Sequence, residues 1–251
     1  MPHAAASIPS GMAHPDAPDE LSPWLALVPA LLLAALVLID TAPIDFLVES
    51  WFYQPGVGFV GRHVWLVETV MHDFLKQAII GFGVLLVLAW LLTWTRGEWQ
   101  RWRRPLGYLV AAIGCASLVV TPLKELTGVH CPWDLEQFGG RYAYVHVGGA
   151  APDGQPAGHC WPAGHAASGF SLLALFFFLR DHRPRLARQV LWAVLLFASL
   201  IGFGRMIQGA HFLSHTVATG LIDWLICLAL YRLLLYRKVV GGPGAIAPAA
   251  G

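Results

Sequence analysis

The sequence predicts an all-α fold, a polytopic membrane protein built as a six-transmembrane-helix bundle. Hydrophobic residues make up 57% of the 251 positions. Charged residues make up only 12%, about half of what a soluble domain usually carries. Long apolar stretches alternate with arginine-rich connections, which is typical of a chain that crosses a bilayer repeatedly. The formal net charge of +1 gives no indication of a nucleic-acid partner.

Six apolar stretches are expected to form the spans. A helix needs about 20 apolar residues to cross a bilayer, so the first, fourth and fifth stretches must extend through neighbouring polar residues. The expected spans are Trp24–Ile39, Leu75–Trp94, Leu106–Leu123, Ala166–Leu179, Val190–Phe203 and Phe212–Tyr236.

The arginines orient this bundle. Connections rich in Lys and Arg mark the cytoplasmic side of a membrane. With six spans, two arginine-rich connections and the C-terminal flank fall on one side: Arg96, Arg101, Arg103 and Arg104, then Arg180, Arg183, Arg185 and Arg188, then Arg237 and Lys238. Both termini are then cytoplasmic.

Three further segments complete the expected organisation. Residues 24–238 are expected to form one membrane domain, and residues 1–23 and 239–251 to be disordered cytoplasmic tails. The aromatic-rich segment Pro43–Asp73 is expected to form short helices at the outer interface.

The same parity places three polar segments together at the outer face. Lys124 stands where the third span ends, Pro162–His165 opens the fourth, and Arg205 and His211 flank the turn before the sixth. Taken singly, these residues have simpler explanations, such as a lysine that snorkels to the interface. Taken together, a guanidinium, an ammonium and free N–H groups at a helix start favour a phosphate.

His211 and His215 are expected to share a helix face, because they are four residues apart. A neutral imidazole that acts as a nucleophile needs a partner on its other ring nitrogen, and His215 is in reach to be that partner. The spacing also suits a metal, although the helical zinc signature has Glu after the first His where this chain has Phe212.

Together these segments resemble the type 2 phosphatidic acid phosphatase superfamily of membrane lipid phosphatases, which is related in fold to vanadium haloperoxidases. That family's pattern is Lys, six residues, Arg-Pro; then Pro-Ser-Gly-His; then Ser-Arg, five residues, His, three residues, Asp. This chain has the same spacings in Lys124 with Cys131-Pro132, in Pro162-Ala163-Gly164-His165, and in Gly204-Arg205 with His211 and His215.

The resemblance implies a phosphate that is held by the side chains of Lys124 and Arg205 and by the backbone N–H groups of Gly164 and Ala163. It implies that His211 attacks phosphorus, that His165 protonates the leaving group, and that water then releases phosphate from phosphohistidine. His215 would orient the nucleophile. No metal or other cofactor is implied.

Four positions depart from the family pattern. Cys131 replaces an arginine, Ala163 and Gly204 replace serines, and His215 replaces an aspartate. Arg141, in the loop between the third and fourth spans, could supply the missing guanidinium.

Cys131 and Cys160 stand at the two ends of that loop. The outer face of a bacterial inner membrane is oxidising, so a disulfide between them is expected.

The expected function is hydrolysis of a phosphomonoester or diphosphate lipid headgroup at the periplasmic face of a bacterial inner membrane. The expected partners are the bilayer and its lipid phosphates, such as undecaprenyl diphosphate, phosphatidic acid, phosphatidylglycerol phosphate or lipid A. Three alternatives remain open: phosphotransfer to a second lipid, a degenerate member that only binds phospholipid, and a metal enzyme that uses His165, His211 and His215.

Overall fold

The computed structural model describes residues 21–62, 64 and 75–236. Helices dominate these residues, and a two-stranded hairpin is the only sheet among them. The longer elements are α1 (Trp24–Leu38), α2 (Ala42–Ser50), α3 (Leu75–Leu92), α4 (Gln100–Thr127), α5 (Gly164–Phe170), α6 (Ala174–Leu179), α7 (Pro184–Ile207) and α8 (Leu213–Leu234). The short ones are β1 (Tyr53–Gln54), β2 (Gly58–Phe59), η2 (Gly97–Trp99), η3 (Pro132–Asp134), η4 (Glu136–Phe138) and η5 (Ser171–Leu173).

Local sequence signals explain where the helices near the polar segments begin and end. Pro184 opens α7, a position where its missing N–H costs nothing. Gly128 caps the C-terminal end of α4 and has a left-handed φ of 63°. Glycine adopts this conformation most easily and therefore often ends a helix. Gly209, with a φ of 73°, turns the chain between α7 and α8.

In the described part of the chain, three helical stretches are long and apolar enough to cross a membrane: Gly97–Asp134, Pro184–Ile207 and Leu213–Leu234. A fourth crossing results if α1 and α2, which meet at 85°, form one broken span. Two further apolar helices, Gln77–Leu92 and Gly164–Leu179, are shorter. Every expected span therefore overlaps a helix, while the count of six stays a prediction.

Several expected details differ from the structure. The fourth span is interrupted, because η5 separates α5 from α6. Only α2 in the segment Pro43–Asp73 is helical among the described residues, and Tyr53 pairs with Phe59 in an antiparallel hairpin. The expected tails lie outside the described residues, except for residues 21–23, and so do residues 63 and 65–73 of the interface segment.

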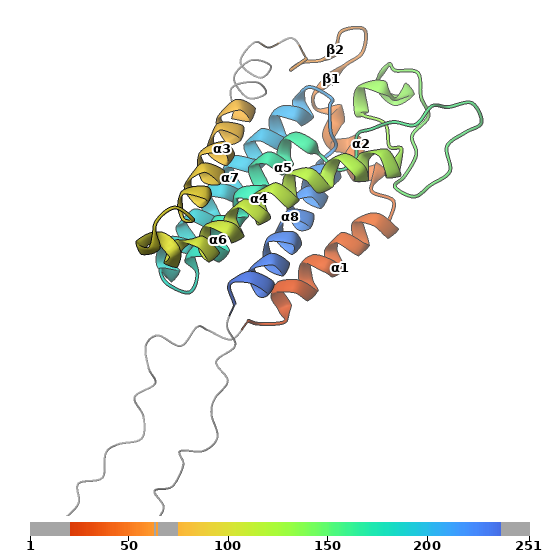
Figure 1. The fold of residues 1–251 in the computed structure, drawn as a ribbon. Coiled ribbons are helices and arrows are strands. Elements are labelled where there is room, and N and C mark those ends of the chain that lie inside the picture. The colour runs from red at the N-terminus through yellow and green to blue at the C-terminus, as the bar shows by residue number, and fades with distance from the viewer. Residues whose placement is uncertain (1–20, 63, 65–74, 237–251) are drawn as a thin grey trace, which may run out of the picture.

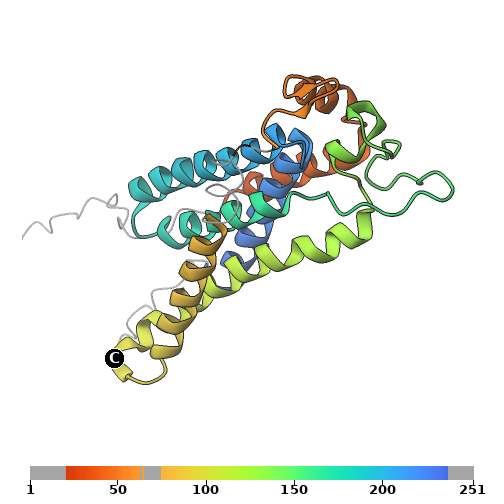
Figure 2. The same cartoon turned by 90° about the horizontal axis from the view of Figure 1, so that it is seen from above.

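The bundle has two chemically different ends (Figure 1). At one end α1 begins and α8 finishes, and the two arginine-rich connections meet them there. The Arg104 guanidinium contacts the carbonyl of Leu234, and the Tyr231 hydroxyl donates to the Asp181 carboxylate. The hairpin, α2 and the 128–163 connection gather at the opposite end, as Figure 2 also shows.

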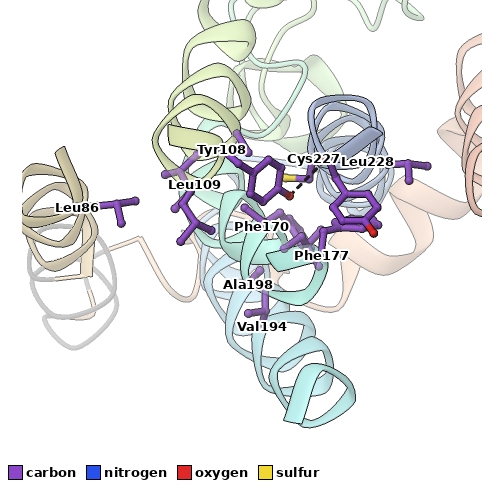
Figure 3. Packing of buried hydrophobic residues seen from close by; sticks show 14 of the residues in the cluster. Leu86, Tyr108, Leu109, Phe170, Phe177, Val194, Ala198, Cys227 and Leu228 are labelled. Carbon is purple, nitrogen blue, oxygen red and sulfur yellow. Dashed lines mark hydrogen bonds between the residues drawn. The ribbon is translucent and has the colours of Figure 1, made fainter. Parts of the chain in front are cut away.

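The core lies between α4, α5, α6, α7 and α8, with Leu86 of α3 at its edge (Figure 3). Tyr108, completely buried, donates to the carbonyl of Cys227 at 3.2 Å. A Cβ added to Gly169 would lie 2.9 Å from the Cβ of Ala198, so α5 and α7 approach closely. Small residues permit such contacts between membrane helices, and this packing holds the start of α5 at a fixed depth.

Candidate active site

The disulfide between Cys131 and Cys160 confirms the predicted bridge and draws two of the polar segments together. Alongside it, the Cys160 N–H donates to the Val129 carbonyl at 2.8 Å, and the Gly158 N–H to the Gly128 carbonyl at 2.9 Å. The end of α4 therefore lies beside the start of α5, although residues 128–163 separate them in the chain.

Lys124, in the last turn of α4, reaches the start of α5. A Cβ added to Gly164 would lie only 3.2 Å from the Lys124 ammonium nitrogen. The ammonium therefore lies beside the backbone of Gly164, and a side chain at that position would come into close contact with it.

Thr219 joins the start of α5 to α8. Its hydroxyl accepts from the Ala163 N–H at 2.8 Å and donates to the His215 carbonyl at 2.8 Å. The Ala163 N–H is therefore already satisfied within the protein. Of the two backbone groups predicted to bind phosphate, this arrangement favours Gly164.

His211 does not lie on a helix, so the expected helix face shared with His215 is wrong. α8 begins at Leu213, and Phe212 is its N-cap, which leaves His211 in the preceding turn. The two imidazole rings are nevertheless close, with their centroids 6.0 Å apart.

The His211 ring contacts the disulfide instead of His215. Its Nδ1 lies 3.4 Å from the Cys160 sulfur, and the Cys160 backbone is within hydrogen-bonding reach of the His215 ring. Cys160 thus stands between the two histidines. The expected hydrogen bond from His215 to His211 is not present in the described part of the chain, so any influence of His215 on the nucleophile is indirect.

His211 is kept uncharged by its surroundings. The side chain is only 3% exposed, and this burial lowers the pKa of His211 well below its ordinary value. The nearby charges of four other motif side chains lower it further: His215, Lys124, Arg205 and His165. A neutral imidazole has a free electron pair, which a nucleophile needs.

Arg205 lies in the last turn of α7 and is partly buried. Its Nη1 donates to the Gln208 side-chain oxygen at 2.6 Å, and its guanidinium carbon lies 5.9 Å from the centre of the Trp133 ring. Gln208 sits one helical turn after Arg205, a spacing that could have indicated the contact. Trp133 follows the Cys131-Pro132 motif and was not predicted.

Asp45 is a second residue that the sequence did not indicate. Its carboxylate accepts from the Ser214 N–H at 3.0 Å and from the Ser214 hydroxyl at 2.5 Å. Asp45 thereby caps the start of α8 from a neighbouring helix, since a carboxylate satisfies the free N–H groups at a helix N-terminus. This contact fixes the backbone directly after His211.

Arg141 is exposed, and its backbone N–H donates to the Asp134 carbonyl at 2.9 Å. None of the side-chain contacts found in the described residues joins Arg141 to the motif segments.

A metal site would have to form from the cluster of Cys160, His211 and His215, whose potential ligand atoms all lie within 4.8 Å of one another. Metals bind cysteine as a thiolate, and the Cys160 sulfur is tied up in the disulfide. His165, the third histidine of the expected metal set, does not belong to this cluster. The two remaining imidazoles are fewer than the three protein ligands of a catalytic zinc site. The donor set as it stands therefore does not fit a metal.

A cavity of about 490 Å³ lies at the other end of the bundle. It is lined by Trp90, Gln100, Arg103, Arg104, Gly107, Tyr108 and Leu234. None of these residues belongs to the motif segments, so this cavity is separate from the candidate active site.

Comparisons with known proteins identify the family of the chain. The family model of the PAP2 superfamily matches residues 105–238, which contain all three motif segments. A solved structure, the "first transmembrane PAP2 type phosphatidylglycerolphosphate phosphatase from Bacillus subtilis", has a similar fold, with a TM-score of 0.51 and 19% identity over 85% of this chain and 96% of that chain. No curated protein sequence matches the chain. Since the family model covers more than half of the residues, the chain belongs to the PAP2 superfamily.

Proposed function

We propose that this protein is an integral membrane phosphatase that hydrolyses a phosphomonoester or diphosphate lipid headgroup through a phosphohistidine intermediate. The observation that carries the proposal is the gathering of Lys124, His165 and Arg205 around a buried, neutral His211. Phosphoryl transfer depends mainly on positioning and on neutralising charge. A fixed set of cations beside one nucleophile supplies both.

The reaction would proceed in two steps. Lys124, Arg205 and the Gly164 N–H would hold the phosphate oxygens. The His211 Nε2 would attack phosphorus, because Nδ1 faces the Cys160 sulfur. As the phosphorus–oxygen bond breaks, His165 would give its proton to the departing oxygen.

In the second step water would attack the phosphohistidine. His165 would accept a proton from that water, and inorganic phosphate would leave with His211 restored. Cys160 would act as the positioning residue of the nucleophile, and His215 would hold the Cys160 backbone. The role that the family pattern assigns to an aspartate would thereby be shared between these two residues.

The site would face the periplasm of a bacterial inner membrane, with six spans and both termini in the cytoplasm. The arginine-rich connections support this orientation, because they lie at the end of the bundle away from the site. The disulfide is consistent with an oxidising compartment. A lipid would enter between helices and present its headgroup at the level of Lys124 and Arg205.

The decisive experiment is phosphate release by the purified protein from the four candidate lipid phosphates, with His211→Ala beside the wild type. We expect release from at least one lipid and a loss of at least about 1000-fold in kcat for the variant, as for other residues that act as nucleophiles. Full activity in His211→Ala would refute the mechanism.

Two further outcomes separate the alternatives. Label that moves from a diphosphate to a second lipid, instead of appearing as inorganic phosphate, would identify a phosphotransferase. Absence of turnover with all four lipids, together with lipid binding that His211→Ala leaves unchanged, would identify a degenerate binding protein.

A further inference from the structure

The site lacks one guanidinium of the family pattern, because Cys131 occupies that position and its sulfur is bonded to Cys160. A different arginine approaches the same place from the N-terminal part of the chain. The Arg62 guanidinium carbon lies 5.3 Å from the centre of the Trp133 ring. Trp133 follows Cys131 by two positions in the sequence. Arg205 lies 5.9 Å from the same ring, so Trp133 contacts both cations.

The three residues are anchored to one short piece of backbone, the turn between α7 and α8. The Gly61 N–H donates to the Ile207 carbonyl at 2.9 Å, and the Trp133 N–H donates to the Gly209 carbonyl at 2.9 Å. Arg205 precedes this turn directly. The approach of Arg62 to the site is therefore built into the fold and is not a chance meeting of two long side chains.

The orientation of the Trp133 ring is also held. Its indole N–H donates to the Asp134 carboxylate at 3.0 Å. A ring fixed in this way offers a stable surface for a guanidinium, which is attracted to an aromatic face. Arg62 consequently loses less side-chain freedom when it binds an anion than an unsupported surface arginine would.

The two guanidinium groups differ in depth. Arg205 is partly buried beside His211, whereas Arg62 is exposed at the rim. Among residues 21–62, 64 and 75–236, no carboxylate forms an ion pair with either of them. With respect to these residues, both positive charges can therefore bind an anionic ligand that extends from the buried nucleophile toward the surface.

The largest possible separation of the two guanidinium groups still permits contact with two linked phosphates. Because each guanidinium lies within 6 Å of one ring centre, their central carbons are at most about 11 Å apart. A diphosphate can fill that span when each charge-assisted contact measures about 2.8 Å. A monophosphate that is bound by Lys124 and Arg205 has no second phosphate that Arg62 could bind.

We propose that Arg62 is a specificity residue that binds the lipid-linked phosphate of a diphosphate headgroup. Lys124 and Arg205 hold the terminal phosphate, which His211 attacks. This inference rests on the proposed phosphatase function and narrows its substrate class to lipid diphosphates. Arg62 thereby brings a guanidinium to a site whose Cys131 position carries no charge.

The test compares a lipid diphosphate with the monophosphate of the same lipid. We expect Arg62→Ala to lower kcat/KM for the diphosphate by at least about 10-fold, the usual effect of losing a charge-assisted hydrogen bond. The loss for the monophosphate should be under about 3-fold, and Arg62→Lys should recover part of the diphosphate activity. Equal losses on both substrates, or no loss on either, would overturn the proposal.

Three controls complete the design. Arg141→Ala, the other arginine considered for this role, should affect the diphosphate less than Arg62→Ala does, and the reverse order would overturn the proposal. Arg188→Ala, exposed at the opposite end, should leave both activities unchanged. Phosphate release by His211→Ala would refute the proposed function itself. If His211→Ala is inactive and Arg62→Ala keeps full activity, only the role of Arg62 is refuted.

Discussion

Removal of the Cys131–Cys160 disulfide should lower both the stability and the activity of the protein, through two separate effects. The bond joins residues 29 positions apart. Closing a loop of that length stabilises the folded state by roughly 3–4 kcal/mol, because it restricts the unfolded chain. In addition, the Cys160 sulfur contacts the His211 ring, so opening the bond releases one side of the nucleophile.

The suitable variant replaces both cysteines by serine, since a single replacement would leave a reactive thiol. For a chain of this size 1 kcal/mol corresponds to about 2–4 °C in the thermal midpoint. We therefore expect the midpoint, followed by tryptophan fluorescence in detergent, to fall by roughly 6–16 °C. The kcat for lipid phosphate should fall as well, and wild-type protein in excess dithiol should behave like the double variant.

Cys115→Ser is the matched control, because Cys115 is an exposed free thiol away from the site. It should change neither the midpoint nor kcat. A double variant with the wild-type midpoint would refute the loop-closure argument. A double variant with a lower midpoint but unchanged kcat would refute the positioning role of Cys160 and leave the stability argument intact.

Two further predictions concern packing and pH. A Cβ on Gly202 would lie 2.4 Å from Thr216 Cγ2 and 3.0 Å from Thr216 Oγ1, so Gly202→Ala should cost about 1–3 kcal/mol. Thr216→Ala in the same chain removes both atoms and should restore the thermal midpoint; a double variant as unstable as Gly202→Ala contradicts this. Burial lowers the pKa of His211 in the folded protein. Between that pKa and about 6.5, the unfolded chain therefore binds more protons than the folded protein does. The free energy of unfolding should consequently fall on acidification by up to about 1.4 kcal/mol per pH unit. Thermal midpoints at pH 7 and pH 5 should therefore differ more for wild type than for His211→Ala, and equal differences would contradict the argument.

Much of the site could be predicted because it depends on local signals. Apolar stretches, arginine-rich connections and motif spacing are properties of neighbouring positions, and they placed Lys124, Pro162–His165 and Arg205 at one end of the bundle. The Cys131–Cys160 bridge followed from the same placement and from the redox state of the compartment. The length of the apolar stretch was a weaker predictor of a membrane span for α3 and for the α5–α6 unit, because both are short for a span.

Other features depend on which surfaces meet. Asp45 caps α8 across 169 positions of sequence, and no local pattern pairs those two residues. His211 was expected on a helix, but Gly209 lets the chain turn before α8 begins, and this turn directs the imidazole toward Cys160 and away from a bond with His215.

Composition and motif order were thus sufficient to predict a membrane helix bundle with a phosphate site at one end, because hydrophobicity and residue spacing act along the chain itself. The neighbours of each charged group could not be obtained in that way. Arg62 and Arg205 both contact Trp133 because separate segments of the chain attach to one turn, and such contacts exist only once the helices and loops have packed.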